Sequence, residues 1–292
     1  MISGHGSSEA ASNNADISEI IDLARAYEPE RYVAATLASD PARLALVALA
    51  AYAGDLARIP DTATQPMLGE IRLQWWRDTL DTIARGGRVG SPLADALAEA
   101  INSFSLPIPM LATMSEARAW DLYNDPMPDQ ASLDGYFSKT EAIPFELALR
   151  VLGVPEGQAG ALSLPAGRAF GLRRLLCRLP VHLASGRMLL PPDMLATYEL
   201  TSAMLLQGQS TLAVQALVDH LVAEVRGTLA SLRPKLRPLS RRQRVAVLPL
   251  AVLSPYLRAI ERRGRNHLRD TADIAPLARV WSIAVAHALG RI

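Results

Sequence analysis

Apolar residues recur at three- and four-residue spacing along most of this chain, which is the spacing of one face of an α-helix. The clearest example is the segment 66–85, where the apolar positions are Leu68, Ile71, Leu73, Trp75, Trp76, Leu80 and Ile83. Similar patterns cover 107–123, 131–152, 157–184, 209–232, 239–264 and 274–290. No stretch of the sequence alternates with period two for long enough to form a sheet. The sequence therefore predicts an all-α protein.

The predicted helices belong to one large domain. The chain has 292 residues, of which 50% are hydrophobic and 20% charged, so it can bury a sizeable core. The breaks between helices are short and rich in Pro, Gly, Asn and Asp, as in NDPMPD at 124–129, and none is long enough to separate two domains. We expect a helical bundle over 16–292 around a central apolar cavity, preceded by a disordered lead over 1–15.

Two helix starts carry local signals in the sequence. Asp40-Pro41 precedes the apolar segment that begins at 42, and Ser91-Pro92 repeats the device before the segment that begins at 93. In both cases the polar residue is expected to cap the helix, and the proline is expected to occupy its first turn.

Residue usage argues against several classes of function. Cys177 is the single cysteine, so a disulfide framework and a thiolate metal site are excluded. The five histidines have neither metal-ligand spacing nor a nucleophile signature, and Gly-rich phosphate loops are absent from the sequence. The longest uncharged apolar runs are about a dozen residues, short of the roughly 20 that span a bilayer. We therefore predict no metal, no cofactor and a cytoplasmic location.

The segment 171–195 contains an unusual stripe of polar residues. Arg174, Arg178 and His182 share one helical face because they are four residues apart, while leucines cover much of the rest of the helix. Like charges at this spacing repel one another, so the stripe requires either acidic neighbours or an anion. One interpretation is an internal cluster of ion pairs with carboxylates of another helix. The other is a site for an anionic ligand or partner.

Four segments resemble the squalene/phytoene synthase family: RYVAATLASDPARLALVALAAYAGDLARI, PMLGEIRLQWWRDTLDTI, ARAWDLYNDPMP and GRMLLPPDML. They occur in order, and the resemblance extends from Arg31 to Arg291. It implies the α-helical fold of the isoprenoid synthases. In the family's head-to-head prenyltransferases, two aspartate-rich helices face a hydrophobic channel and hold magnesium with the substrate diphosphates.

The aspartates that this resemblance implies are largely missing here. The first motif falls near 52–61 and retains at most Asp61, and the second falls at positions occupied by Arg178 and His182. The register is anchored because four following residues of the family pattern do match, namely Gly186, Arg187, Leu190 and Pro191. Replacing two acids by a base and an imidazole would repel a magnesium ion. The resemblance thus implies a pseudoenzyme without catalytic residues.

One further pair of aspartates has the spacing of such a motif. Asp121 and Asp125 are four residues apart, but Pro126 disfavours a helical conformation at 125. We therefore predict a helix end that runs into a turn, and no relocated metal motif.

The closer resemblance is to a branch of the family that includes a mitochondrial complex I assembly factor and its bacterial relatives. It implies a non-catalytic protein that acts in assembly of a membrane respiratory complex, with complex subunits or other assembly factors as partners. The alternative is a true head-to-head prenyltransferase. A third hypothesis, compatible with the first, is direct binding of an anionic isoprenoid or lipid headgroup at a candidate site made of Asp61, Arg174, Arg178, His182 and Arg187.

Two surfaces are candidates for contact with a partner or membrane. Trp75 and Trp76 point in different directions around one helix, so one is expected in the core and the other on a contact surface. The basic run at 233–244, which includes Arg241, Arg242 and Arg244, is most often a solvated surface. It also suits peripheral attraction to an anionic membrane, at the inner membrane if the client is a respiratory complex. The run lacks interleaved aromatic residues, so we predict no nucleic-acid binding.

Overall fold

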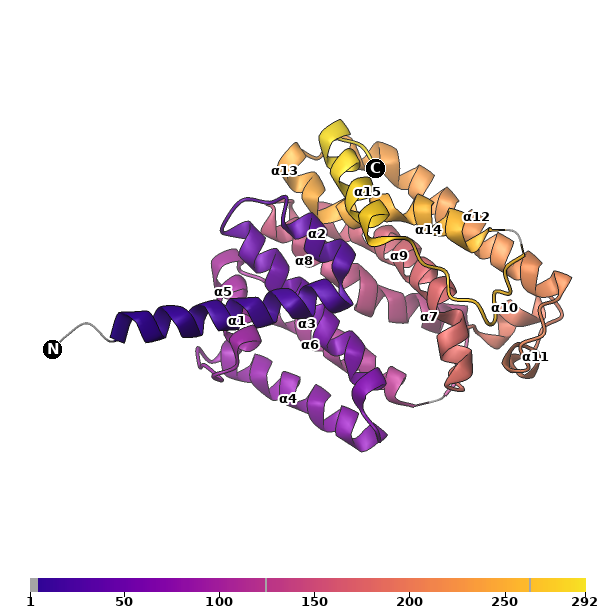
Figure 1. Ribbon diagram of the computed structural model, residues 1–292, viewed down its shortest axis with the longest axis horizontal. Helices are drawn as coiled ribbons and strands as arrows, with labels where there is room; N and C mark the ends of the chain where they lie inside the picture. Colours follow the sequence, from indigo (N-terminus) through magenta and orange to yellow (C-terminus); the bar gives the residue numbers. More distant parts are fainter. Residues whose placement is uncertain (1–4, 124, 263) are drawn as a thin grey trace.

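A computed structural model describes residues 5–123, 125–262 and 264–292, and over these ranges every regular element is helical (Figure 1). The helices of the first half are α1 (His5–Tyr27), α2 (Pro29–Ala35), α3 (Ala42–Thr62), α4 (Pro66–Ala84), α5 (Pro92–Phe104), α6 (Ile108–Arg118), α7 (Gln130–Phe137) and α8 (Ile143–Val151). Those of the second half are α9 (Glu156–Ala184), α10 (Pro192–Ala196), α11 (Ser202–Leu206), α12 (Leu212–Leu236), α13 (Arg241–Arg244), α14 (Leu253–Ile260) and α15 (Pro276–Leu289). The prediction of an all-α fold is confirmed.

Most helices lie where the apolar spacing places them. The helices α4, α9 and α15 begin and end within two residues of the predicted ranges. The range 239–264 is divided, because the 3₁₀ segment η3 (Val245–Val252) lies between α13 and α14 and contains Pro249, which has no N–H to donate. The range 131–152 is likewise divided by a π-helical turn, η2 (Ser138–Ala142). The short helix α2 was not predicted from the spacing.

The two expected helix starts differ from each other. Ser91 is the N-cap residue of α5 and Pro92 lies in its first turn, as predicted, although the Ser91 side chain makes no capping hydrogen bond. The prediction for Asp40 is wrong. The N-cap residue of α3 is Pro41, and the Asp40 carboxylate instead accepts a hydrogen bond from Arg43 Nη2 at 2.6 Å.

The lead that we expected to be disordered over 1–15 overlaps α1 from residue 5 onward. Residues 1–4 of that lead lie outside the described residues. The C-terminal part of α1 packs on α3 through buried residues such as Ile20 and Ala24.

The core of the bundle is built around α3 and α9. Both helices are buried along most of their length because small and aliphatic residues occur on nearly all their faces. Tyr52 of α3 is completely buried, and its hydroxyl donates to the Leu111 carbonyl at 2.8 Å, which satisfies its polar atom inside the core. The helix α9 packs against α8 and α12.

Two glycines bring α9 very close to the segment that joins α7 to α8. A Cβ atom at Gly167 would lie 2.4 Å from the Ala142 backbone, and one at Gly171 would lie 2.5 Å from the Phe137 ring. Since neither distance is possible for a real side chain, only glycine permits this approach. Because of this close approach, the turn η2 and its residue Glu141 lie against the face of α9 that carries Arg174 and Arg178.

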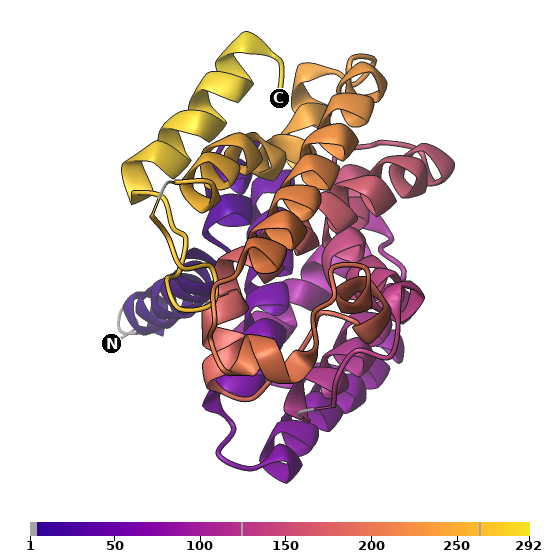
Figure 2. The same ribbon diagram turned by 90° about the vertical axis from the view of Figure 1, so that its right-hand side faces the viewer.

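The C-terminal helix α15 lies on the outside of the bundle, as Figure 2 shows. It packs on η3 and α2 through its buried residues Ile283 and Ala286. No helix among the described residues is both long enough and apolar enough to cross a bilayer.

Candidate functional site

A cavity of about 490 Å³ opens between α3, α9 and the segments that follow α6 and α14, and we call it the central cavity. Its wall includes six acidic side chains: Glu30, Asp61, Asp121, Asp125, Glu141 and Asp273. It also includes six arginines: Arg118, Arg173, Arg174, Arg178, Arg187 and Arg279. All five residues of the predicted ligand site lie in this wall. The formal charges of the acids and the arginines therefore cancel.

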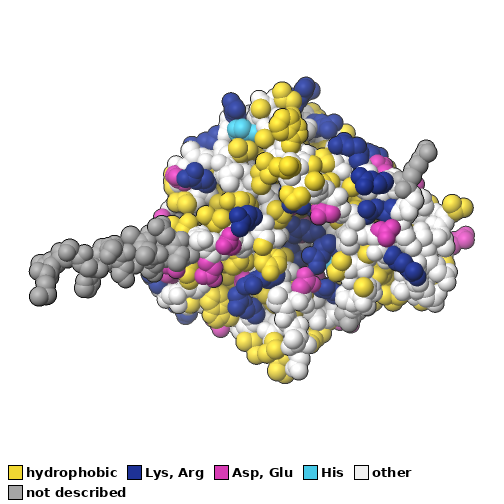
Figure 3. Space-filling model, in the orientation of Figure 1, with side chains coloured by type: hydrophobic (Ala, Val, Ile, Leu, Met, Phe, Trp, Pro, Cys, Tyr) yellow, Lys and Arg dark blue, Asp and Glu magenta, His cyan; other side chains and the backbone are white. Residues whose placement is uncertain are grey.

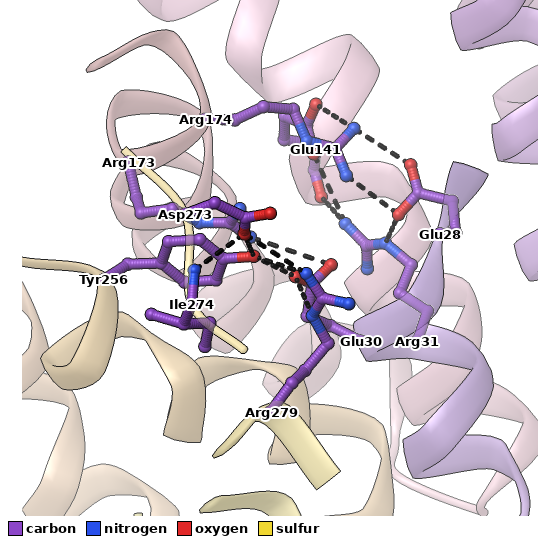
Figure 4. A network of polar contacts seen from close by, with 10 residues as sticks. All are labelled: Glu28, Glu30, Arg31, Glu141, Arg173, Arg174, Tyr256, Asp273, Ile274 and Arg279. Atoms are coloured by element: carbon purple, nitrogen blue, oxygen red, sulfur yellow. Dashed lines mark hydrogen bonds and ion pairs between the residues drawn. The ribbon is translucent and has the colours of Figure 1, made fainter. Parts of the chain in front are cut away.

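The deepest ion pairs form an inner cluster of Glu28, Arg31, Glu141 and Arg174 (Figure 4). Arg174 donates to both carboxylate oxygens of Glu28 at 2.9 Å and to Glu141 Oε1 at 3.2 Å. Arg31 donates to Glu28 at 3.1 Å and to Glu141 Oε2 at 3.4 Å. Each acid thus contacts both bases, and the cluster joins α2, η2 and α9.

Burial and charge act in opposite directions on the inner cluster. Burial by itself would raise the pKa of Glu28, which is 1% exposed, but the charges of Arg174 and Arg31 outweigh it and lower the pKa to about 2. The Arg31 guanidinium also lies over the Phe145 ring, 4.3 Å from its centroid, so its remaining face is covered. Burial lowers the pKa of Arg31, while the carboxylates of Glu28 and Glu141 act in the opposite direction. Removing one member of the cluster strands its partners in a buried site.

A second set of polar contacts links α2 to the C-terminal helices (Figure 4). Arg279 of α15 pairs with Glu30 at 3.2 Å and donates to the Tyr256 hydroxyl at 2.8 Å. The Tyr256 hydroxyl also lies 3.1 Å from Glu30 and 3.1 Å from Asp273. These contacts hold α15 against the edge of the central cavity.

Nearer to solvent, Asp61, Arg178 and Arg187 form an outer cluster. Asp61 Oδ2 accepts from Arg178 at 2.7 Å, and Oδ1 accepts from Arg187 at 2.9 Å. The Arg178 and Asp61 side chains are 44% and 37% exposed. Burial would raise the pKa of Asp61, but the two arginines lower it. Of the two interpretations of the stripe, the distances favour internal ion pairs, because both Arg174 and Arg178 have carboxylate partners.

His182 does not contribute a positive charge to the stripe. Burial, aided by the charges of Arg187 and Arg178, lowers the pKa of His182 to about 4, so its imidazole is neutral at pH 7. Its Nδ1 atom is buried and has no hydrogen-bond partner among the described residues. The positive charges of the stripe are therefore those of Arg174 and Arg178.

Asp55, one helical turn and a half before Asp61, serves the fold instead of the cavity. It is buried and accepts from Trp76 Nε1 at 2.7 Å and from Arg58 at 2.7 Å. Trp76 is accordingly the core member of the tryptophan pair, at 1% exposed, which removes it from the predicted contact surface. Trp75 is only partly buried and packs against the core from outside.

The predicted basic surface at the start of α13 is not uniform. Arg241 and Arg242 are exposed, as a contact surface requires. Arg244 is partly buried and donates to the carbonyl oxygens of Gly290 at 2.5 Å and Arg237 at 3.0 Å. It therefore ties the end of α15 to the end of α12 while keeping its positive charge.

The acids of the inner cluster were missed in the sequence. Glu28 directly precedes α2, and Glu141 lies in the π-helical turn, so neither belongs to a recognisable motif. The available signal was the run EPER at 28–31, which places three ionisable residues beside a long apolar segment. The partner of Glu28, Arg174, is 146 residues away in the chain, and spacing carries no information on such a pair.

The fold and the charged cavity place this protein in the class of helical isoprenoid synthase-type bundles. A squalene synthase from Alicyclobacillus acidocaldarius has the same fold, with a TM-score of 0.75 and 19% identity over 87% of this chain and 96% of that chain. The sequence profile of squalene/phytoene synthases matches residues 24–279. The chain therefore belongs to the squalene/phytoene synthase family.

Relatives with curated names point in two directions. Complex I assembly factor 6 from Bos taurus is 27% identical over 173 residues, which cover 59% of this chain and 52% of that protein. Presqualene diphosphate synthase from Rhodopseudomonas palustris is 28% identical over 131 residues, which cover 44% of this chain and 46% of that protein. The chain matches only about half the length of these curated relatives.

The cavity wall does not fit the magnesium that the family implies. Arg178 already donates a hydrogen bond to the Asp61 carboxylate. The Asp121 carboxylate accepts from Arg118 at 3.1 Å and from the Tyr136 hydroxyl. Among residues 5–123, 125–262 and 264–292, no group of three or more His, Cys, Asp or Glu side chains is arranged to hold a metal ion. A magnesium ion would have to displace arginines from the carboxylates it needs.

Proposed function

We propose that this protein is a non-catalytic member of its family that acts in assembly of respiratory complex I, together with complex subunits or other assembly factors. One observation carries the loss of catalysis: Arg178 and His182 occupy the positions at which the family's second aspartate motif is expected, and Arg178 pairs with Asp61 across the cavity. The assembly role is supported by the similarity to proteins named complex I assembly factor 6.

The test of this role is deletion of the gene in the organism that encodes it. We expect membranes of the deletion strain to lose NADH-dependent quinone reduction and the fully assembled complex on native gels. Succinate-dependent quinone reduction should be unchanged, which controls for general damage to the respiratory chain. A plasmid copy of the native gene should restore both. If the deletion strain assembles complex I normally, the assembly role is wrong.

A second candidate function is head-to-head prenyl transfer. The similarity to presqualene diphosphate synthase and the open central cavity favour it. The assay is product formation from farnesyl diphosphate with magnesium and reductant, and we expect none. Turnover at ordinary enzyme rates, on the order of 1 per second, would overturn the non-catalytic assignment.

For the central cavity we infer that the four charged residues of the candidate ligand site, Asp61, Arg174, Arg178 and Arg187, act mainly as ion pairs. Six acids offset six arginines in the wall, so an anionic isoprenoid or lipid headgroup would gain little net attraction there. Calorimetric titration with inorganic diphosphate, with and without magnesium, tests this inference. We expect no saturable binding below about 1 mM.

We also infer that the protein is peripheral to the inner membrane, because the inferred client is a membrane complex. The exposed basic residues of the C-terminal third, including Arg241 and Arg242, support this location through attraction to anionic lipids. The association is testable by fractionation: the protein should leave the membrane pellet when salt is raised, since exposed charges are screened within about 8 Å at physiological ionic strength.

A further inference from the structure

The helix α15 is apolar on the side that faces solvent as well as on the side that faces the core. Its exposed side chains include Leu277 at 82%, Trp281 at 72% and Leu289 at 58%. The ionisable residues within the helix are Arg279, which turns inward to Glu30, and His287. A helix that is hydrophobic all round is normally covered on both sides. Figure 3 shows the resulting patch of hydrophobic side chains over α15, with basic side chains at its edges.

Beside this patch runs a groove of about 600 Å³ between α15 and the helices α12 and α14, which we call the basic groove. Its charged lining residues are all arginines: Arg233, Arg237, Arg244, Arg258 and Arg291. Arg244 donates to the carbonyl oxygen of Gly290 at 2.5 Å, which leaves its charge uncompensated, whereas Arg233 donates to a main-chain oxygen of Ile292 at 2.9 Å. Within the described residues, no side-chain carboxylate pairs with any of the five. Such a groove attracts an anion.

We propose that the basic groove and the exposed face of α15 together dock the protein on an anionic lipid bilayer, an inference that deepens the peripheral location proposed above and rests on it. Guanidinium groups bind phosphates through paired hydrogen bonds, which suits the arginines to lipid headgroups. Trp281, which lines the groove, and the exposed Leu277 would enter the boundary between headgroups and acyl chains. One surface thus offers both kinds of contact that a bilayer interface provides.

The same observations disfavour a second copy of the chain as the occupant. A symmetric dimer through this face would bring two sets of five arginines together with no side-chain carboxylate among the lining residues of either groove, which is repulsive. An acidic protein segment would satisfy the arginines, but it would not account for the exposed Leu277, Trp281 and Leu289 unless it were also strongly apolar. A bilayer supplies negative charge and apolar depth over one continuous surface.

The test uses the purified full chain and vesicles of phosphatidylcholine with or without phosphatidylglycerol. We expect the native protein to sediment with the anionic vesicles only, and less at high salt. Trp281→Ser should weaken binding about tenfold, because it removes a large apolar side chain from the interface. Arg258→Ala should weaken it about fivefold. The matched controls, Met67→Ser on α4 and Arg85→Ala, change equally exposed residues elsewhere and should bind like the native protein.

Depth of insertion gives a second readout. Vesicles with brominated acyl chains should quench tryptophan fluorescence in the native protein and much less in Trp281→Phe, because Trp75 and Trp76 lie on α4 and Trp120 follows α6, whereas the patch lies on α15. Circular dichroism checks that each variant is folded.

Several results would overturn the docking surface. The native protein could fail to bind vesicles, or Trp281→Ser and Met67→Ser could lose the same fraction of vesicle binding. Quenching could be independent of Trp281. The protein could instead bind an acidic peptide and no vesicles, or it could form a dimer that Trp281→Ser abolishes. Vesicle binding is measured without complex I, whereas the deletion strain is scored by complex I assembly. Failure of the docking surface and failure of the assembly role are therefore distinguishable.

Discussion

The central cavity and the basic groove are of similar size, about 490 and 600 Å³, but they differ in charge. Every arginine of the inner and outer clusters has a side-chain carboxylate within 4 Å, whereas the five arginines of the groove have no side-chain carboxylate partner among the described residues. An arginine whose charge is matched inside the protein stabilises the fold, while an unmatched one is available to bind. The local balance of charge, and not the number of arginines, therefore distinguishes a structural cluster from a surface that can bind an anion.

The largest difference between the two regions is expected when an arginine of the inner cluster is replaced. Arg174→Met leaves Glu28 and Glu141 buried with fewer bases, so the free energy of unfolding should fall by about 3 to 5 kcal/mol. The matched change in the groove, Arg258→Met, should leave it within about 0.5 kcal/mol of the native value. Urea denaturation measures both. Equal effects of the two substitutions would show that charge balance does not distinguish the two regions.

A somewhat smaller effect is expected from acid. The folded-state pKa of Glu28 is about 2, below its ordinary value of 4.5, so its stabilisation is present above pH 4.5 and is lost as pH falls through 4.5 towards 2. This group alone should cost about 3 kcal/mol of stability between pH 5 and pH 2. Denaturation at a series of pH values should therefore give a shallower loss for Glu28→Gln than for the native protein. A loss with the same slope in both proteins would contradict the lowered pKa.

The smallest effect is expected in the outer cluster. Arg178 and Asp61 are both substantially exposed, and Arg187 still binds Asp61 when Arg178 is removed. Arg178→Ala should therefore lower the free energy of unfolding by less than about 1 kcal/mol. The double substitution Arg178→Ala with Arg187→Ala should cost more than the sum of the two single changes, because only then is Asp61 left unpaired. If the two single losses of unfolding free energy simply add, Arg178 and Arg187 do not compensate for each other in neutralising Asp61.

Much of the fold could be predicted from the sequence, because helix spacing and helix ends are local properties. The ranges of α4, α9 and α15 follow from the positions of their apolar residues. The start of α3 did not, because Asp40 found a side-chain partner in Arg43 that competes with capping. The short helix α2 was missed because its seven residues offer too few turns for a periodic pattern.

The candidate site was only partly predictable. The face of α9 with Arg174 and Arg178 followed from spacing, and both residues do line the central cavity. Their partners did not follow, since Glu28 and Glu141 meet Arg174 only through tertiary packing, which for Glu141 depends on the close approach at Gly167 and Gly171. The neutral state of His182 also depends on burial between elements that a single sequence does not place together.

The helix α15 lines both the central cavity and the basic groove, so binding at one of them can affect binding at the other. On α15, Arg279 holds Glu30 at the wall of the central cavity, while Trp281, two residues further on, lines the basic groove. A molecule that shifts α15 when it binds at the central cavity therefore changes the free energy of binding at the basic groove, and the reverse also holds. Such coupling is reciprocal: if a molecule in the cavity alters the affinity of the groove by some factor, docking of the groove alters the affinity of the cavity by the same factor.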